Sequence, residues 1–192
     1  MSVVARKFPW SRKDRHDDDP YWNFFIKTPP ADLTNTVTEL IRNAPAGNIF
    51  PTPADIHTPE VTAHHLKDMA RYFGAELVGV AQLETNSGNN PDDYPFAVVC
   101  AVRADYDPRV SPGIGGQVPV QNGLFITFVL SAWIRELGFR ASVAPDLEAE
   151  TLAAQAGLGT LNAEGRLVTP QFGAKVYIAD AICTDLPLAA DG

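Results

Sequence analysis

The sequence has few of the side chains that hold metals. It contains 2 cysteines and 4 histidines in 192 residues. A cubane iron–sulfur cluster needs about four thiolates, so Cys100 and Cys183 exclude an internal cluster. Both cysteines lie in apolar, strand-like runs, where we expect buried small hydrophobic residues. The histidines lack the spacing of a zinc site. The residues therefore predict no protein-bound metal.

The sequence also lacks an excess of positive charge and a long apolar run. Its net charge is −8, which disfavours nonspecific binding to nucleic acid, because such binding depends on neutralising phosphates. We find no apolar run of the roughly 18 residues that a membrane helix needs. The N-terminus has no apolar segment of the secretory type. These absences predict a cytoplasmic protein that binds neither nucleic acid nor membranes.

Proline and charge are concentrated in residues 1–58. We expect this part to be an extended N-terminal arm with one short helix over residues 32–43, where leucine and isoleucine recur at helical spacing. Aromatic residues at 21–25 are expected to dock the arm on the core or on a partner. Residues 59–192 then form the core, which is long enough for one domain.

Hydrophobic periodicity predicts the elements of this core. Helices are expected at 58–74, 118–137 and 146–157, and strands at 76–81, 96–102, 139–144 and 175–183. The strand at 96–102 is apolar on both faces and is expected to be central. In the last strand, Val176, Ile178 and Ile182 are expected to share a face. The order of elements predicts an α/β sandwich with a mixed sheet.

The most informative segment follows the helix that ends near residue 157. Gly157, Gly159 and Gly165 fall within nine residues, and Gly173 lies in a Thr-Pro-x-Phe-Gly turn. Glycine permits positive φ and close approach of a ligand to the backbone. The segment therefore has two interpretations, a tight connection whose glycines serve only turns, or a loop that binds a flat ligand.

The sequence of this segment resembles that of a known family. It reads AQAGLGTLNAEGRLVTPQFGAKVYI and continues to TDLPL. This is similar to the corrinoid-binding segment of cobalamin-dependent reductive dehalogenases and epoxyqueuosine reductases, and residues 62–81 and 132–139 resemble other parts of the same core. The resemblance implies a nitroreductase-like fold that binds cobalamin. The residues that it would assign to the cofactor are Gly157, Leu158, Gly159, Thr160, Leu161, Gly165, Leu167, Val168, Thr169, Pro170, Phe172 and Gly173.

The acid–base residues that the resemblance implies are altered in this chain. These families place a tyrosine or an aspartate as proton donor just before a long helix, but residues 113–122 contain neither. Tyr106 is the candidate substitute. Lys175 and Tyr177 replace basic residues of the family's strand, where they could tune or supply a proton or could belong to an ordinary strand face. These three residues are our catalytic candidates.

Two functional hypotheses follow from these observations. The chain could be a cobalamin-dependent reductase served by an external electron-transfer protein, or a binding or accessory protein without catalysis of its own. An alternative is a degenerate homologue that binds another flat cofactor, haem or flavin, or a structural partner subunit. The chain could also be one part of a larger protein. The long apolar helix at 118–137 further predicts a homodimer.

Overall fold

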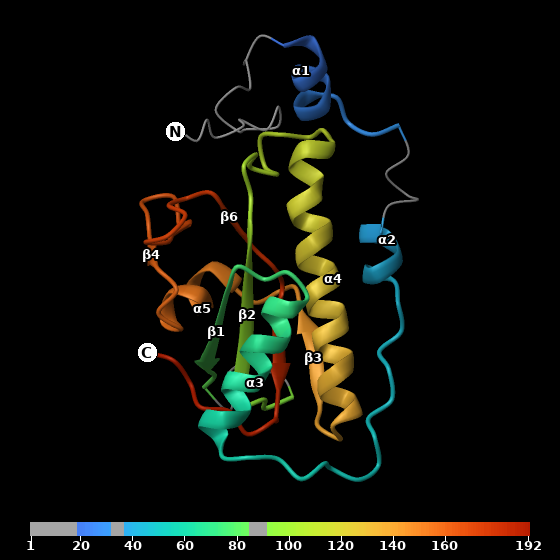
Figure 1. Cartoon of the computed structure of the whole chain (residues 1–192), viewed down its shortest axis with the longest axis vertical. Coiled ribbons are helices and arrows are strands. Elements are labelled where there is room, and N and C mark those ends of the chain that lie inside the picture. Colours follow the sequence, from blue (N-terminus) through green and yellow to red (C-terminus); the bar gives the residue numbers. More distant parts are fainter. Residues whose placement is uncertain (1–18, 32–36, 85–91) are drawn as a thin grey trace, which may run out of the picture.

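The computed structural model describes residues 19–31, 37–84 and 92–192. A single main sheet lies between helices α3 and α4 on one face and α5 on the other (Figure 1). The helices are α1 (Pro20–Lys27), α2 (Val37–Arg42), α3 (Pro59–Tyr72), α4 (Ile114–Glu136) and α5 (Ala149–Gln155). The strands are β1 (Leu77–Gln82), β2 (Phe96–Arg103), β3 (Ala141–Ala144), β4 (Thr160–Leu161), β5 (Leu167–Val168), β6 (Val176–Ile178) and β7 (Ala181–Thr184).

Every strand pair in the described part of the main sheet is antiparallel. The order is β1-β2-β7-β3, and β6 also pairs with β2. The expectation of an α/β fold is confirmed, but the expected mixed sheet is wrong. Strands β2 and β3, which α4 connects, are not neighbours, because β7 lies between them and runs antiparallel to both.

The predicted strand at 175–183 is interrupted by a bulge. Ala101 pairs with Ile178, whereas Val98 pairs with Ile182, so β2 spans three steps while its partner spans four. One extra residue in a strand reverses which face its later side chains occupy. Val176 and Ile178 accordingly pack on the α5 side, but Ile182 packs on the α3/α4 side. The prediction that all three share a face is wrong.

Strand β2 is central and buried on both faces, as predicted. Val98, Cys100 and Val102 point to the α3/α4 core, while Ala97 and Val99 point to the α5 core. Cys100 and Cys183 are both free and buried, which confirms their expected role as core residues. Burial raises the pKa of the Cys100 thiol to about 12, and burial together with Asp92 raises that of Cys183 to about 11.

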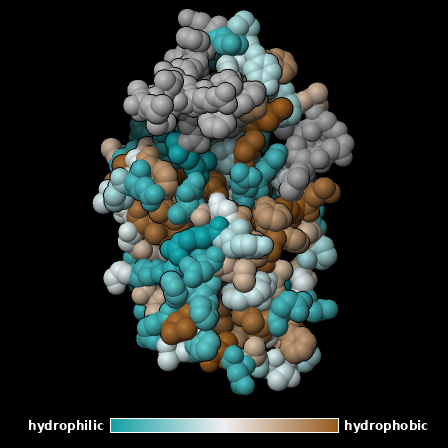
Figure 2. All heavy atoms as spheres, viewed as in Figure 1, coloured by the Kyte–Doolittle hydropathy of each residue, from teal (hydrophilic) through white to brown (hydrophobic). Residues whose placement is uncertain are grey.

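Helix α4 begins at Ile114, four residues before the predicted start at 118. Glycines on its first turns let other parts of the chain approach closely, since a Cβ at Gly116 would meet the Ser111 carbonyl oxygen. The helix is not buried all round, because Phe125 is 47% exposed and Ile114, Val118 and Phe128 are also exposed. Figure 2 shows apolar residues at the surface on the face that carries α4. The sequence predicts that this helix is buried nearly all round, partly at a twofold interface, and that prediction is not met within one chain and stays a prediction for the assembly.

By length and composition alone, α4 could cross a membrane, which the sequence-based expectation did not anticipate. The core helix of a globular domain passes the same test, and 44% of its most apolar window is buried inside the structure. Ile126, Leu130 and Ile134 pack in the α3/α4 core.

The N-terminal arm contains more structure than the sequence predicted. Helix α1 is capped by the Asp19 side chain, which accepts a hydrogen bond from the Tyr21 amide, and Pro20 occupies its first turn. Of the helix expected at 32–43, α2 covers Val37–Arg42, and residues 32–36 lie outside the described part. The following segment runs along α4 to α3 (Figure 1), where the amides of Phe50 and Ala54 donate to carbonyls at the C-terminal end of α4.

The sequence predicts N-caps at Thr58 and Asp146, residue types that favour this position, and the structure confirms only the position of Thr58. Thr58 precedes α3 but makes no capping hydrogen bond with its side chain. Helix α5 begins at Ala149 after Glu148, so Asp146 lies outside the helix that it was expected to cap.

The segment Thr184-Asp-Leu-Pro-Leu188 has a structural role. Thr184 Oγ1 donates to the Arg140 carbonyl at 2.7 Å and accepts from the Leu186 amide at 3.0 Å. Asp185 accepts from the backbone amide and Nε of Arg140 at 2.7 and 2.6 Å. Leu186 and Leu188 are buried in the α3/α4 core. The segment therefore anchors the end of the sheet to the residues that enter β3.

Candidate functional site

The glycine-rich segment folds as a small hairpin on the α5 side of the sheet. Strand β4 pairs with β5 in antiparallel register. In the turn, the Gly165 amide donates to the Asn162 carbonyl, the Asn162 amide donates to the Arg166 carbonyl, and Gly165 has a φ of +72°. Glycine is favoured in this left-handed conformation. The segment is thus an ordered turn in its own right.

The other glycines also have reasons within the chain. Gly157 ends α5 with a φ of +70°, and Gly173 closes the next turn with a φ of +58°. At Gly159 the reason is different, because a Cβ there would lie 2.4 Å from the Val168 carbonyl oxygen. A Cβ at Gly157, Gly165 or Gly173 would meet nothing within 4 Å. Turn geometry therefore explains Gly157, Gly165 and Gly173, which also face open space, and close packing explains Gly159.

Charged side chains join the hairpin to the loop after β2. Arg166 Nη1 lies 2.6 Å from Asp107 Oδ2. Glu150 of α5 accepts a hydrogen bond from the Leu167 amide at 2.7 Å and another from Arg109 at 2.8 Å. Sequence reasoning did not identify Glu150, Arg109 or Arg166 as site residues. No local pattern in the sequence marks these three residues, because their partners lie far away along the chain.

The ion pair of Asp107 with Arg166 ties the loop that carries one catalytic candidate, Tyr106, to the hairpin. Tyr106 lies in the same loop as Asp107, and its half-buried ring is 6.4 Å from the ring of Phe25 in α1. A Cβ at Gly115, in the first turn of α4, would lie 3.1 Å from the Tyr106 ring. Tyr106 is therefore placed between α1, α4 and the loop that the hairpin holds.

The other two catalytic candidates are placed differently. Tyr177 packs on the α3/α4 side of the sheet, where its ring would lie 3.1 Å from a Cβ at Gly123. Burial, followed by the charge of Asp180, raises the pKa of the Tyr177 phenol, which keeps it protonated at neutral pH. Lys175 is exposed and makes no ion pair among the residues that the structure describes. The structure thus packs both tyrosine rings against α4, Tyr106 beside Gly115 and Tyr177 beside Gly123.

The cofactor-binding candidates divide by exposure. Leu167 and Thr169 are buried, and Leu158, Val168 and Phe172 are half-buried. Thr169 fixes the second turn, since its Oγ1 accepts from the Phe172 amide at 3.0 Å and donates to the Gly173 carbonyl at 3.2 Å. The half-buried Gly159 and Gly173 belong to the hairpin backbone. The candidates that face solvent are Gly157, Thr160, Leu161, Gly165 and Pro170.

Two cavities of the described structure lie away from the hairpin. A cavity of about 380 Å³ lies between α2, α4 and β3, and a more open one of about 670 Å³ lies beside β1, α5 and the C-terminus. Neither of these two cavities is lined by residues 157–173. Within residues 19–31, 37–84 and 92–192, no group of three His, Cys, Asp or Glu side chains is placed to hold a metal.

Comparison with solved structures identifies this arrangement of elements. No protein-family model and no curated protein matches the sequence. A reductive dehalogenase structure described in terms of B12-dependent dehalogenation superposes with a TM-score of 0.65 at 24% identity over 81% of this chain. A catabolic reductive dehalogenase superposes with a TM-score of 0.66 at 25% identity over 81% of this chain. The chain has the fold of the reductive dehalogenases.

The reductive dehalogenase fold extends to a second group of enzymes and covers only part of each. Epoxyqueuosine reductase from Bacillus subtilis superposes over 67% of this chain with a TM-score of 0.52 at 14% identity. This chain spans 23% of the length of each of the two reductive dehalogenases and 46% of the epoxyqueuosine reductase. The superfamily that the sequence motifs suggested is therefore the one that the structure matches.

Proposed function

We propose that this chain binds a corrinoid, cobalamin in the first instance, on the exposed side of the 157–173 hairpin. The proposal is supported by the fold that this chain shares with a reductive dehalogenase described in terms of B12-dependent dehalogenation. The sequence of the hairpin, which resembles a corrinoid-binding segment, supports it as well. The same resemblance supports assigning the core to the nitroreductase-like sandwiches.

The hairpin fits one side of a large flat ligand. Three of its glycines face open space, so that ligand amide groups can approach the main chain. Leu161, which is 40% exposed, offers apolar contact on the same hairpin. Because the hairpin does not line either cavity described above, a ligand here would stay largely accessible to solvent. We therefore expect modest affinity from this chain alone.

The residues present favour a binding or accessory role over independent catalysis. A bound corrinoid would supply the redox chemistry, and electrons would have to come from a separate electron-transfer protein. Tyr106 is the best-placed proton donor of the three candidates, because its loop is held to the hairpin by the contact between Asp107 and Arg166. Tyr177 instead contributes to packing against α4. Lys175 remains available as a solvent-exposed cation beside β6.

The test is a visible absorbance titration of the full chain with hydroxocobalamin, and separately with haem and with flavin mononucleotide. We expect a saturable change with the corrinoid. The variant Leu161→Arg places a charge on the exposed hairpin and should weaken binding at least about tenfold, which is about 1.4 kcal/mol. Tyr72→Arg is the matched control, since Tyr72 is 83% exposed on α3.

Two outcomes contradict the proposal. Saturable binding of haem or flavin in place of cobalamin would assign the surface to another flat cofactor. Equal affinity of the Leu161→Arg and Tyr72→Arg variants for hydroxocobalamin would place the ligand elsewhere. A substitution at Gly159 would confuse binding with folding, because a side chain there would collide with the hairpin's own backbone.

We also propose that the chain forms a homodimer through the exposed apolar stripe of α4. Ile114, Val118, Phe125 and Phe128 recur on one side of this helix and are exposed. Twofold pairing would remove this surface from water, and homodimers are the commonest assembly.

A further inference from the structure

We propose that the cavity between α2, α4 and β3 binds a small organic carboxylate, whose charge is held by Arg135 and whose apolar body fills the rest of the cavity. This site is separate from the hairpin and does not depend on corrinoid binding.

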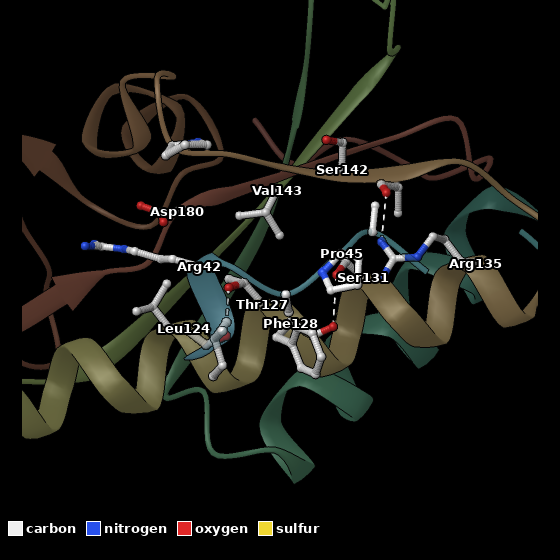
Figure 3. A pocket seen from close by; sticks show the side chains of 15 residues that line it. Arg42, Pro45, Leu124, Thr127, Phe128, Ser131, Arg135, Ser142, Val143 and Asp180 are labelled. Atoms are coloured by element: carbon white, nitrogen blue, oxygen red, sulfur yellow. Dashed lines mark hydrogen bonds between the residues drawn. The ribbon is translucent and has the colours of Figure 1, made fainter. Parts of the chain in front are cut away.

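The cavity has the size and lining of a small-molecule site. Its volume of about 380 Å³ lies near the lower end of typical ligand pockets, which hold about 300–1,000 Å³. Figure 3 shows Val143 of β3 and Pro45 of the segment after α2 on either side of the space that α4 closes with Leu124 and Phe128. Apolar walls of this kind suit a compact ring or branched chain.

One end of the cavity carries a buried cation without a counter-charge. Arg135 is 8% exposed, and within the described residues its guanidinium makes a single hydrogen bond, from Nη1 to the Ala141 carbonyl at 2.9 Å. Its Nε is buried and has no partner there. No carboxylate of the described chain pairs with it. Burial lowers the pKa of Arg135, because removing the cation from water disfavours its charged form.

A carboxylate would supply what this guanidinium lacks. Nη1 and Nη2 carry the other N–H groups of the guanidinium, and a carboxylate can accept end-on from one hydrogen of each. The main chain at Gly47 covers the Nε edge of the guanidinium, since a Cβ there would be 3.4 Å from Nε and 3.7 Å from Nη2. A ligand must therefore approach from the cavity, where Figure 3 shows the Arg135 side chain reaching from α4 toward β3.

The other polar groups of the cavity leave Arg135 as its main anchor for an anion. Thr127 and Ser131 donate to carbonyls of their own helix, at 3.1 and 2.9 Å, so their hydroxyls are available mainly as acceptors. Arg42 and Asp180, of opposite charge, line the other end. The electrostatic preference of the cavity for a negative group is therefore concentrated at the Arg135 end.

The experiment is calorimetric titration of the full chain with benzoate, and with benzamide as an uncharged molecule of similar shape. We expect benzoate to bind and benzamide to bind at least about tenfold more weakly, because a charge-assisted hydrogen bond contributes more than a neutral one. Arg135→Gln should weaken benzoate binding about tenfold or more. Arg42→Gln, at the opposite end of the cavity, should change it less than about twofold.

A second variant covers the case in which Arg135→Gln does not fold. Val143→Phe narrows the cavity from β3 and should abolish benzoate binding in a chain that still unfolds cooperatively in urea. The proposal is overturned if benzoate does not bind at about 10 mM, if benzamide binds equally well, or if Val143→Phe leaves benzoate affinity unaltered.

Discussion

Replacing Thr184 by valine tests whether the Thr184–Leu188 segment is part of the fold rather than of a ligand site. Valine keeps the shape and the branched Cβ but removes the hydroxyl. The Leu186 amide, which donates to Thr184 Oγ1 at 3.0 Å in a buried position, then has no partner. The Arg140 carbonyl loses its bond of 2.7 Å but retains a weaker one from Asp185 at 3.4 Å. We therefore count one fully orphaned group.

A buried donor left without a partner costs about 1–3 kcal/mol, and the weakened acceptor adds part of a hydrogen bond. We expect Thr184→Val to lower the free energy of unfolding by about 2–3 kcal/mol. In a chain of this size that corresponds to a fall in Tm of about 5–10 °C. Urea denaturation measures the loss as a lower midpoint at unchanged slope. Thr184→Ser, which restores the hydroxyl, should recover most of the stability.

Thr127→Val is the matched control. Thr127 is as buried as Thr184, but its hydroxyl donates to the Leu124 carbonyl within α4, which also accepts a helix hydrogen bond. We expect a loss below about 1 kcal/mol. Equal losses for the two variants would refute the assignment of a special structural role to Thr184. A loss of cobalamin binding without a loss of stability would refute it as well.

Three further predictions follow from burial and close packing. Cys100 and Cys183 have thiol pKa values raised to about 12 and 11, so they should react with Ellman's reagent only on unfolding. The free energy of unfolding should fall above about pH 8.5, because the unfolded chain releases thiol protons that the folded chain retains. Rapid native labelling would contradict this. Light scattering should give twice the chain mass of 20.8 kDa, and Phe125→Asp should give the monomer whereas Tyr72→Asp should not. A monomeric parent chain would end the dimer proposal. Gly159→Ala should lower the free energy of unfolding by about 1–3 kcal/mol, since its Cβ would meet the Val168 carbonyl oxygen at 2.4 Å. An unchanged urea midpoint would contradict this and show that the hairpin shifts to accommodate the methyl group.

Local pattern was sufficient for the elements whose burial is regular. The strand at 96–102 was predicted as central, because every position is apolar, and β2 has that place. The helix at 58–74 was predicted from its apolar stripe, and α3 buries Leu66 and Ala70 from it. The burial of both cysteines followed from the same strands.

Other features depend on contacts that a single sequence does not reveal. The start of α4 was missed because Gly115, Gly116 and Pro119 disfavour helix, whereas close packing against residues far away in the chain favours it here. Helix α1 was missed although Asp19-Pro20 is a regular helix start. The antiparallel sheet was missed because strand direction depends on β7 lying between β2 and β3.

The candidate site was predictable only in its location along the chain. The glycine segment was identified from its motif, but the sequence did not decide between turn geometry and ligand contact. The structure supplies a turn reason for Gly157, Gly165 and Gly173 and a packing reason for Gly159. The ion pair of Arg166 with Asp107 joins residues 59 positions apart, counting from 107 to 166. No local pattern predicts such a pair.

The bulge between β6 and β7 has a consequence for how related chains should be aligned. Both strands contribute side chains to both hydrophobic cores, and the extra residue is the point at which the alternation between the two faces changes phase. Homologues with and without that residue would agree in hydrophobic pattern on one side of it and be out of phase on the other. A gap at Ala179–Asp180 is therefore structurally meaningful. An alignment that moves the gap by a few positions would exchange Tyr177 with a neighbour that faces the opposite layer.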